Sequence, residues 1–211
     1  MEVFQMLSSA DLEHFDPIVR TPAIETVDFV RSQLPTWMKD RERWHAVLIQ
    51  SDPAVIRLYT AYNVEAGQAR PIRRRVFLHC LVPASTNFKK LLGNDFSPTG
   101  YRWEKVPDHR HEWPIVGQLQ EGSLVSHRGV GALEAPPAEL EPHQLYPGQY
   151  HSLVGSNSYH RIELETDEVF TLIVAGGRFD QLAPSYRPSY IALPEPVRDK
   201  FLERHSGFYA L

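Results

Sequence analysis

The spacing of apolar residues predicts helices at both ends of the chain. Within residues 23–40, apolar side chains recur every three or four positions, as on one face of a helix; they are Ile24, Val27, Val30 and Leu34. Pro35 is expected to end this helix, because proline cannot donate a helical hydrogen bond. A second apolar face follows Pro196, which suits a first helical position; its residues are Val197, Phe201 and Leu202. We expect a short C-terminal helix there.

From residue 44 onward the pattern is that of short strands. Runs rich in β-branched and aromatic residues follow one another, with Gly, Pro, Asn and Asp between them. They are "WHAVLIQ", "AVIRLYTAYNV", "RRVFLHCLVPA", "YRWEKV", "PIVGQLQEGSLVSH", "QLYPGQYHSLV", "SYHRIEL" and "VFTLIVAGG". Residues 132–143 carry three prolines and are expected to form a loop, because proline cannot donate to a strand ladder. The spacing is typical of an all-β sandwich or barrel.

These two changes divide the chain into three segments. We expect an N-terminal helical segment over residues 1–43, a β-barrel over residues 44–195 and a helical tail over residues 196–211. A chain of 211 residues is long enough to bury a substantial core and most simply holds one domain.

Composition narrows the choice of partners and compartment. The net charge is −4, and the 22 basic residues are scattered apart from "RRR" at 73–75, so nucleic acid is not an expected partner. The single cysteine, Cys80, excludes an internal disulfide framework. The N-terminus lacks the basic and apolar regions of a signal peptide, and no apolar run reaches the ~20 residues of a membrane helix. We therefore expect a cytoplasmic protein with no membrane partner; a homodimer is left open.

Two histidines one residue apart offer the first candidate chemistry. His109 and His111 lie in "WEKVPDHRHEWPIVGQLQEG", and in a strand they would project side by side from one face. That arrangement suits chelation of a metal. An arbitrary H-x-H is more often a pair of exposed histidines, so further residues must support the site.

Glycines and a third histidine supply that support. Gly122 lies eleven positions after His111, and Gly148 opens a later strand whose return, past the "GSN" turn, reaches His160 twelve positions on. With His109, these residues resemble the two motifs of the cupin superfamily, over roughly residues 100–180. The resemblance implies a double-stranded β-helix barrel, here with N-terminal helices, and a metal held by the three histidines.

The ligand set departs from the common cupin pattern. The glutamate of the family is expected four residues after His111, and that position is Ile115. Glu112 should face away in a regular strand, although Pro114 would permit a bulge. The expected set is therefore three neutral imidazoles with open positions. Imidazole suits iron, zinc, copper or nickel; Fe(II) is the expected metal, with Zn(II) or another divalent transition metal as the alternative.

His151, in "GQYHSL", leaves one assignment open. It stands three residues after Gly148 and is a ligand in place of His160, an acid or base in the cavity, or an outward-facing histidine. We predict the catalytic role, because an inward histidine beside a cation is suited to moving protons. His79, in "VFLHCLV", is interpreted as a hydrogen-bonded core histidine, and Cys80 as a small buried residue.

Two further residues are candidates for substrate binding. Trp113 continues the face of His109 and His111 and is expected in the pocket wall. Arg102 is the candidate for pairing a substrate carboxylate, with Arg75 and Arg178 as competitors.

Three functions remain in view. A three-histidine set without glutamate is similar to that of the thiol dioxygenases, but their Ser-x-His-x-Tyr has no counterpart in "VFTLIVAGG". The first expectation is a mononuclear non-haem iron oxygenase, a dioxygenase in the broad sense, acting on a small polar metabolite. The alternatives are a zinc cupin catalysing a non-redox lyase, isomerase or bond-forming reaction on an amino-acid-like substrate, and a metal-free binding barrel.

Overall fold

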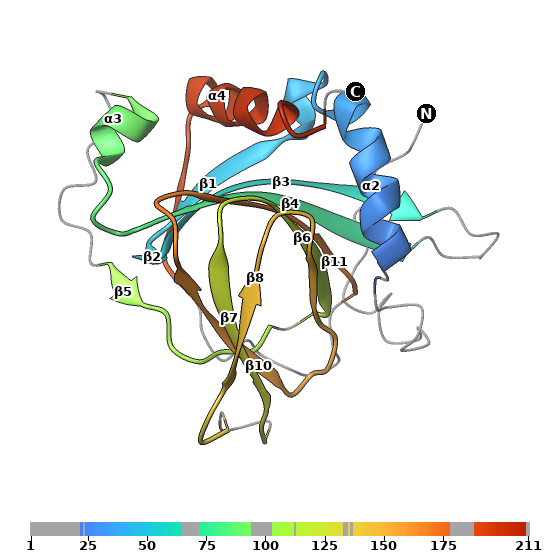
Figure 1. Ribbon diagram of the computed structural model, residues 1–211. Helices are drawn as coiled ribbons and strands as arrows, with labels where there is room; N and C mark the ends of the chain where they lie inside the picture. The colour runs from blue at the N-terminus through green and yellow to red at the C-terminus, as the bar shows by residue number, and fades with distance from the viewer. Residues whose placement is uncertain are drawn as a thin grey trace.

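The computed structural model describes residues 22, 24–64, 72–93, 103–111, 113–132, 135, 137–177 and 188–209. Most of the described residues outside loops lie in strands, with helices near the ends of the described chain (Figure 1). In chain order the elements are α2 (Ile24–Trp37), η2 (Arg41–Arg43), β1 (His45–Ile49), β2 (Ser51–Asp52), β3 (Ala54–Val64), β4 (Ile72–Val82), α3 (Phe88–Leu92), β5 (Glu104–Lys105), β6 (Ile115–Glu121), β7 (Leu124–Val130), β8 (Glu141–Leu145), β9 (Tyr150–Leu153), β10 (Ser158–Leu164), β11 (Val169–Ala175), β12 (Tyr190–Ala192) and α4 (Glu195–Ser206).

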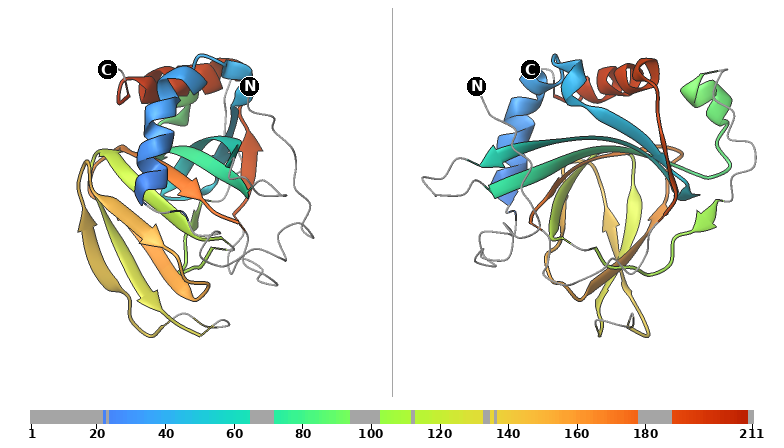
Figure 2. Two further views of the ribbon diagram at one scale, coloured as in Figure 1. Left: turned by 90° about the vertical axis from the view of Figure 1, so that its right-hand side faces the viewer. Right: turned by 180° about the vertical axis from the view of Figure 1, so that it is seen from behind.

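Two antiparallel sheets make up the body of the structure. The larger has seven strands in the order β12-β1-β3-β4-β11-β6-β9, and the smaller has three in the order β10-β7-β8. The small sheet lies opposite the large one, below it in Figure 1 and again in the turned views of Figure 2. A third, two-stranded sheet pairs β2 with β5 in parallel. The all-β architecture predicted from the sequence is present as two facing antiparallel sheets.

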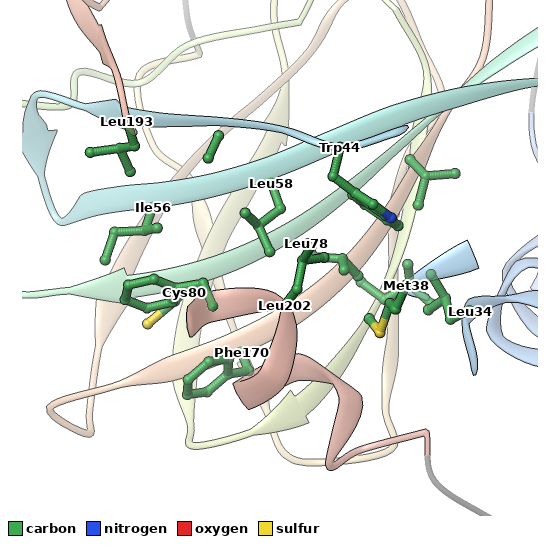
Figure 3. Close-up of a cluster of buried hydrophobic side chains, with 14 of the residues drawn as sticks. Leu34, Met38, Trp44, Ile56, Leu58, Leu78, Cys80, Phe170, Leu193 and Leu202 are labelled. Atoms are coloured by element: carbon green, nitrogen blue, oxygen red, sulfur yellow. The ribbon is translucent and has the colours of Figure 1, made fainter. Parts of the chain in front are cut away.

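Helices α2 and α4 cover the outer face of the large sheet (Figure 2). The main hydrophobic core lies between them and the sheet, and Figure 3 shows Trp44, Leu58, Leu78 and Leu202 within it. Trp44 is 1% exposed, and its indole Nε1–H donates to the carbonyl of Trp37, 3.1 Å away. The predicted apolar faces are buried at Val27, Val30 and Leu34 of α2 and at Val197, Phe201 and Leu202 of α4. Ile24, which was also predicted on the face of α2, is 48% exposed.

Strand β11 of the large sheet is buried on both faces, which explains its largely apolar sequence. All seven residues of β11 are buried, as is typical of strands covered on two sides. One set of side chains enters the core under the helices, and the alternate set faces the small sheet. The second set includes Arg57, Phe77 and His79, which line a cavity between the sheets.

Proline behaves differently from the expectation at two places. Pro35 does not end α2, which continues to Trp37; burial of Trp37 and Met38 in the core offsets the cost of a proline in the last turn. The expected loop over residues 132–143 overlaps β8, which contains Pro142. That strand is the edge of the small sheet, where a missing backbone donor is tolerated. Residues 1–21 and 23 of the expected N-terminal segment lie outside the described residues.

Candidate metal centre

A backbone bridge joins the two histidine motifs. The amide of His109 donates to the carbonyl of His160 at 2.9 Å, and the amide of His160 donates to the carbonyl of His109 at 2.8 Å. This reciprocal pair is an isolated antiparallel bridge. The H-x-H does not belong to a longer strand, which agrees with Pro107 and Pro114 on either side, since proline cannot extend a ladder.

Three imidazoles converge at this bridge. The ring centroids of His109 and His160 lie 4.5 Å apart, those of His111 and His160 4.9 Å, and those of His109 and His111 5.1 Å. One nitrogen from each ring can be chosen so that all three lie within 4.8 Å of one another. The predicted proximity of the three histidines is therefore present, with His160 rather than His151 as the third member.

Hydrogen bonds set the orientation of this cluster. Nδ1 of His109 lies 3.0 Å from the carbonyl oxygen of Pro107. Since only an N–H can donate to a carbonyl, Nδ1 carries the proton and Nε2 keeps its lone pair. The side chain of Arg161, next to His160 on β10, donates to Asp108 at 3.0 Å and so fastens the loop that carries His109 to the strand.

Burial keeps the three rings neutral. Loss of hydration lowers the pKa of His109, and it lowers the pKa values of His111 and His160 well below the usual range. The neighbouring histidines add to the effect for His111 and His160, because two adjacent imidazolium charges repel. Neutral imidazole is the form that binds a metal.

The donor set fits a divalent transition metal. A metal with nitrogen ligands at about 2.0–2.1 Å requires those nitrogens to stand about 3 Å apart. Nε2 of His111 and Nε2 of His160 are 2.8 Å apart. Three imidazoles on one side leave positions open on the other.

The open side faces a cavity of about 810 Å³. All three histidines lie in its wall, together with apolar side chains from the inner face of the large sheet; these include Val47, Ile49, Val55, Phe77, Leu81, Ile115 and Ile173. Ile115 is 4% exposed, so the position that holds a carboxylate in the common cupin pattern contributes only apolar surface here. Among the described residues, no aspartate or glutamate lines the cavity.

His151 also lines the cavity but lies outside the cluster. It sits on β9, paired with Gly117 of β6, and is 8% exposed. Its ring occupies the space beside Gly117, because a Cβ built there would lie 2.6 Å from Cε1 of His151. Burial, and then the charge of Arg128, lower the pKa of His151 to about 4. The ring is neutral at neutral pH and can accept a proton.

A buried arginine–histidine pair forms another part of the wall. Arg57 on β3 is paired with His79 on β4, and its Nε–H donates to Nε2 of His79 at 2.9 Å. The expected hydrogen-bonded role of His79 is confirmed, with the addition that the ring lines the cavity. Arg57 was not predicted from the sequence. Its position in "AVIRLYTAYNV" is the only sequence signal, a single charge in an otherwise apolar strand.

The remaining candidates are placed as follows. Trp113 is half-buried and lines the cavity, with the guanidinium of Arg75 over its ring, 4.5 Å from the centroid. Arg102, Arg178 and Glu112 lie outside the described residues. Cys80 is buried, and burial raises the pKa of its thiol to about 12, as expected for a structural cysteine.

Comparisons with known proteins add distant neighbours. No protein-family model matches the chain, and no curated protein matches its sequence. Similar solved structures include Fe(II) HppE (12% identity, TM-score 0.33, 56% of this chain and 50% of that chain). They also include a chain from the DMSP lyases RdDddP and RnDddQII (14% identity, TM-score 0.31, 61% of this chain and 52% of that chain). The Escherichia coli ribosomal oxygenase YcfD is another (10% identity, TM-score 0.36, 98% of this chain and 68% of that chain).

The chain thus spans about half the length of the first two neighbours. These identities and TM-scores define neither a substrate nor a reaction. No helix among the described residues is long and apolar enough to cross a membrane.

Proposed function

We propose that the protein is a mononuclear non-haem iron oxygenase, with Fe(II) held by His109, His111 and His160, that acts on a small polar metabolite. The observation that carries the proposal is the convergence of three neutral imidazoles on the wall of the cavity. A double-stranded β-helix is part of the same proposal, supported by two antiparallel sheets that face each other across the site.

When bound, the metal would supply activation of dioxygen beside a substrate in the cavity. The chain itself contributes position, shelter from water and proton handling. Apolar residues of β1, β3, β4 and β11 surround the open side of the cluster and exclude water. His151 lines the cavity, and we assign to its ring the transfer of a proton to or from the substrate.

The test begins with elemental analysis of protein purified without chelator. We expect one iron per chain in the wild type, and removal of any one imidazole should abolish most of it, because three ligands leave no redundancy. His109→Ala and His160→Ala are the test variants. His151→Ala is the matched control within the same cavity and should keep the metal. Full metal content in both test variants would contradict the site.

Oxygen consumption with a pool of small metabolites tests the reaction. We expect uptake by the iron-loaded wild type and a loss of about 10²-fold in His151→Ala, the usual scale for a general acid or base. Zinc in place of iron, with no oxygen uptake, would instead indicate a non-redox reaction. Absence of any metal would indicate a binding barrel.

A further inference from the structure

The cavity wall contains a guanidinium, that of Arg57, for which the described residues provide no carboxylate. Arg57 is half-buried, and its exposed part faces the cavity. Its Nε–H is used by His79, and its guanidinium stands over Phe77, 4.8 Å from the ring centroid. Neither group carries a negative charge at neutral pH. Among the described residues, no carboxylate lies within ion-pair distance of Arg57 or lines the cavity.

A buried guanidinium without a counter-ion lowers the stability of the fold unless a ligand neutralises its charge. Burial lowers the pKa of Arg57 to about 10, the mark of an arginine that has lost hydration without gaining a counter-ion. Chains normally pair a buried guanidinium with a carboxylate. Among the described residues no carboxylate lines the wall, which carries Arg75 and Arg110 as well as Arg57 beside its apolar side chains.

The hydrogen bond to His79 fixes how the arginine can bind a ligand. Because the Nε–H of Arg57 already donates to His79, the two terminal nitrogens of the guanidinium are the remaining donors. Their parallel N–H groups match the two oxygens of a carboxylate. His79 must accept at Nε2, so its proton is on Nδ1 and its ring is neutral.

The same arginine acts electrostatically on the histidine cluster. The pKa of His111 is lowered first by burial, and then by His109 and by the charge of Arg57. An anion bound at Arg57 would therefore lie close to the cluster. The bound carboxylate would balance the guanidinium of Arg57, and the apolar part of the wall would contact the rest of the molecule.

We propose that the substrate is a small carboxylate, and that the guanidinium of Arg57 holds its carboxylate group while His79 positions the guanidinium. This inference rests on the proposed function for its chemistry, but the binding event can be measured without turnover.

The probes are 3-phenylpropanoate and the neutral 3-phenylpropanamide, titrated calorimetrically into metal-loaded protein. We expect the carboxylate to bind the wild type and to bind Arg57→Gln about tenfold or more weakly, the scale of a charge-assisted hydrogen bond. The amide should bind both proteins equally weakly. Arg198→Gln is the control, because Arg198 pairs with Asp199 on α4 and does not line the cavity; it should retain binding within about threefold of the wild type.

Two further variants test the positioning role of His79. His79→Gln keeps an acceptor for Nε and should bind 3-phenylpropanoate nearly as well as the wild type. His79→Leu removes the acceptor and should weaken binding, even where thermal unfolding shows a folded protein. If His79 acted only through the stability of the fold, both substitutions would weaken binding of 3-phenylpropanoate to the same extent.

Several results would overturn the inference. They are equal affinity of the carboxylate for the wild type and Arg57→Gln, equal affinity of the wild type for carboxylate and amide, and no binding of the carboxylate to the wild type at millimolar concentration. Metal content is measured on the same samples. Bound metal with no dependence on Arg57 refutes the carboxylate site and leaves the proposed function standing, whereas carboxylate binding through Arg57 without metal refutes the proposed function alone.

Discussion

His205 should lower the free energy of unfolding in acid, and the size of this effect can be measured with a single substitution. It lies on α4 and is 0% exposed. Its ring stands edge-on to Phe170 and Phe208, with centroids 5.1 Å and 6.1 Å away. Neither ring nitrogen has a hydrogen-bond partner among the described residues. Burial, and then the charge of Arg204, lower the pKa of His205 to about 3 from its ordinary 6.5.

The sign follows from which state takes up the proton. Below pH 6.5 the unfolded chain protonates His205, whereas the folded chain keeps it neutral until about pH 3. Stability is therefore fully present above the unfolded pKa and is lost as the pH falls. Between about pH 8 and about pH 5 this single group should remove about 2 kcal/mol of the free energy of unfolding.

The perturbation is His205→Phe, measured by urea unfolding at both pH values. For each protein we take the change in the free energy of unfolding between the two pH values. An effect of the substitution on packing does not depend on pH and cancels in this difference. The other buried histidines are present in both proteins and contribute equally. The variant should thus lose about 2 kcal/mol less than the wild type on acidification. His143→Phe, which removes an exposed histidine, should behave like the wild type. An equal loss of stability in His205→Phe and the wild type would refute the reasoning.

Two other variants address the candidate site. Gly117→Ala should destabilise by about 1–3 kcal/mol, because the new Cβ would meet Cε1 of His151 at 2.6 Å and the ring must move; urea unfolding measures this, and unchanged stability would show that the ring has room. Metal stoichiometry should not change in this variant. Ile115→Glu should tighten metal binding by adding a carboxylate beside the cluster while closing a position that substrate or oxygen needs; competition with a chelator and oxygen uptake measure the two effects, and rising activity would contradict the open position.

Local patterns predicted the elements, because their signals are short-range. The strand over residues 54–64 was read from β-branched and aromatic residues between breakers, and β3 has those bounds. The meeting of His109 and His111 with His160 could be predicted only through the resemblance to the two cupin motifs. A helix end at Pro35 could not, because the burial of Trp37 that outweighs the proline depends on tertiary packing.

Arg57 was missed for a physical reason. Where one face of a strand is solvated, apolar and polar residues alternate and the faces can be told apart. In β3 buried and partly exposed residues alternate, and Arg57 lies on the partly exposed face, where an arginine is ordinarily solvated. Its pairing with His79 depends on the register of β3 against β4, which the sequence alone does not show. Arg102, chosen for its nearness in sequence to the H-x-H, stays a prediction.

The unequal covering of the two sheets sets where the structure can open. Helices shield the outer face of the large sheet, whereas four of the five residues of β8 are exposed. Amide hydrogen exchange should be slowest in β4 and β11 and fastest in β8, since weakly covered elements open locally at low cost. The amide of His160 bonds to the carbonyl of His109 across the histidine cluster. The exchange rate of the His160 amide therefore reports how often the small sheet separates from the loop that carries His109 and His111.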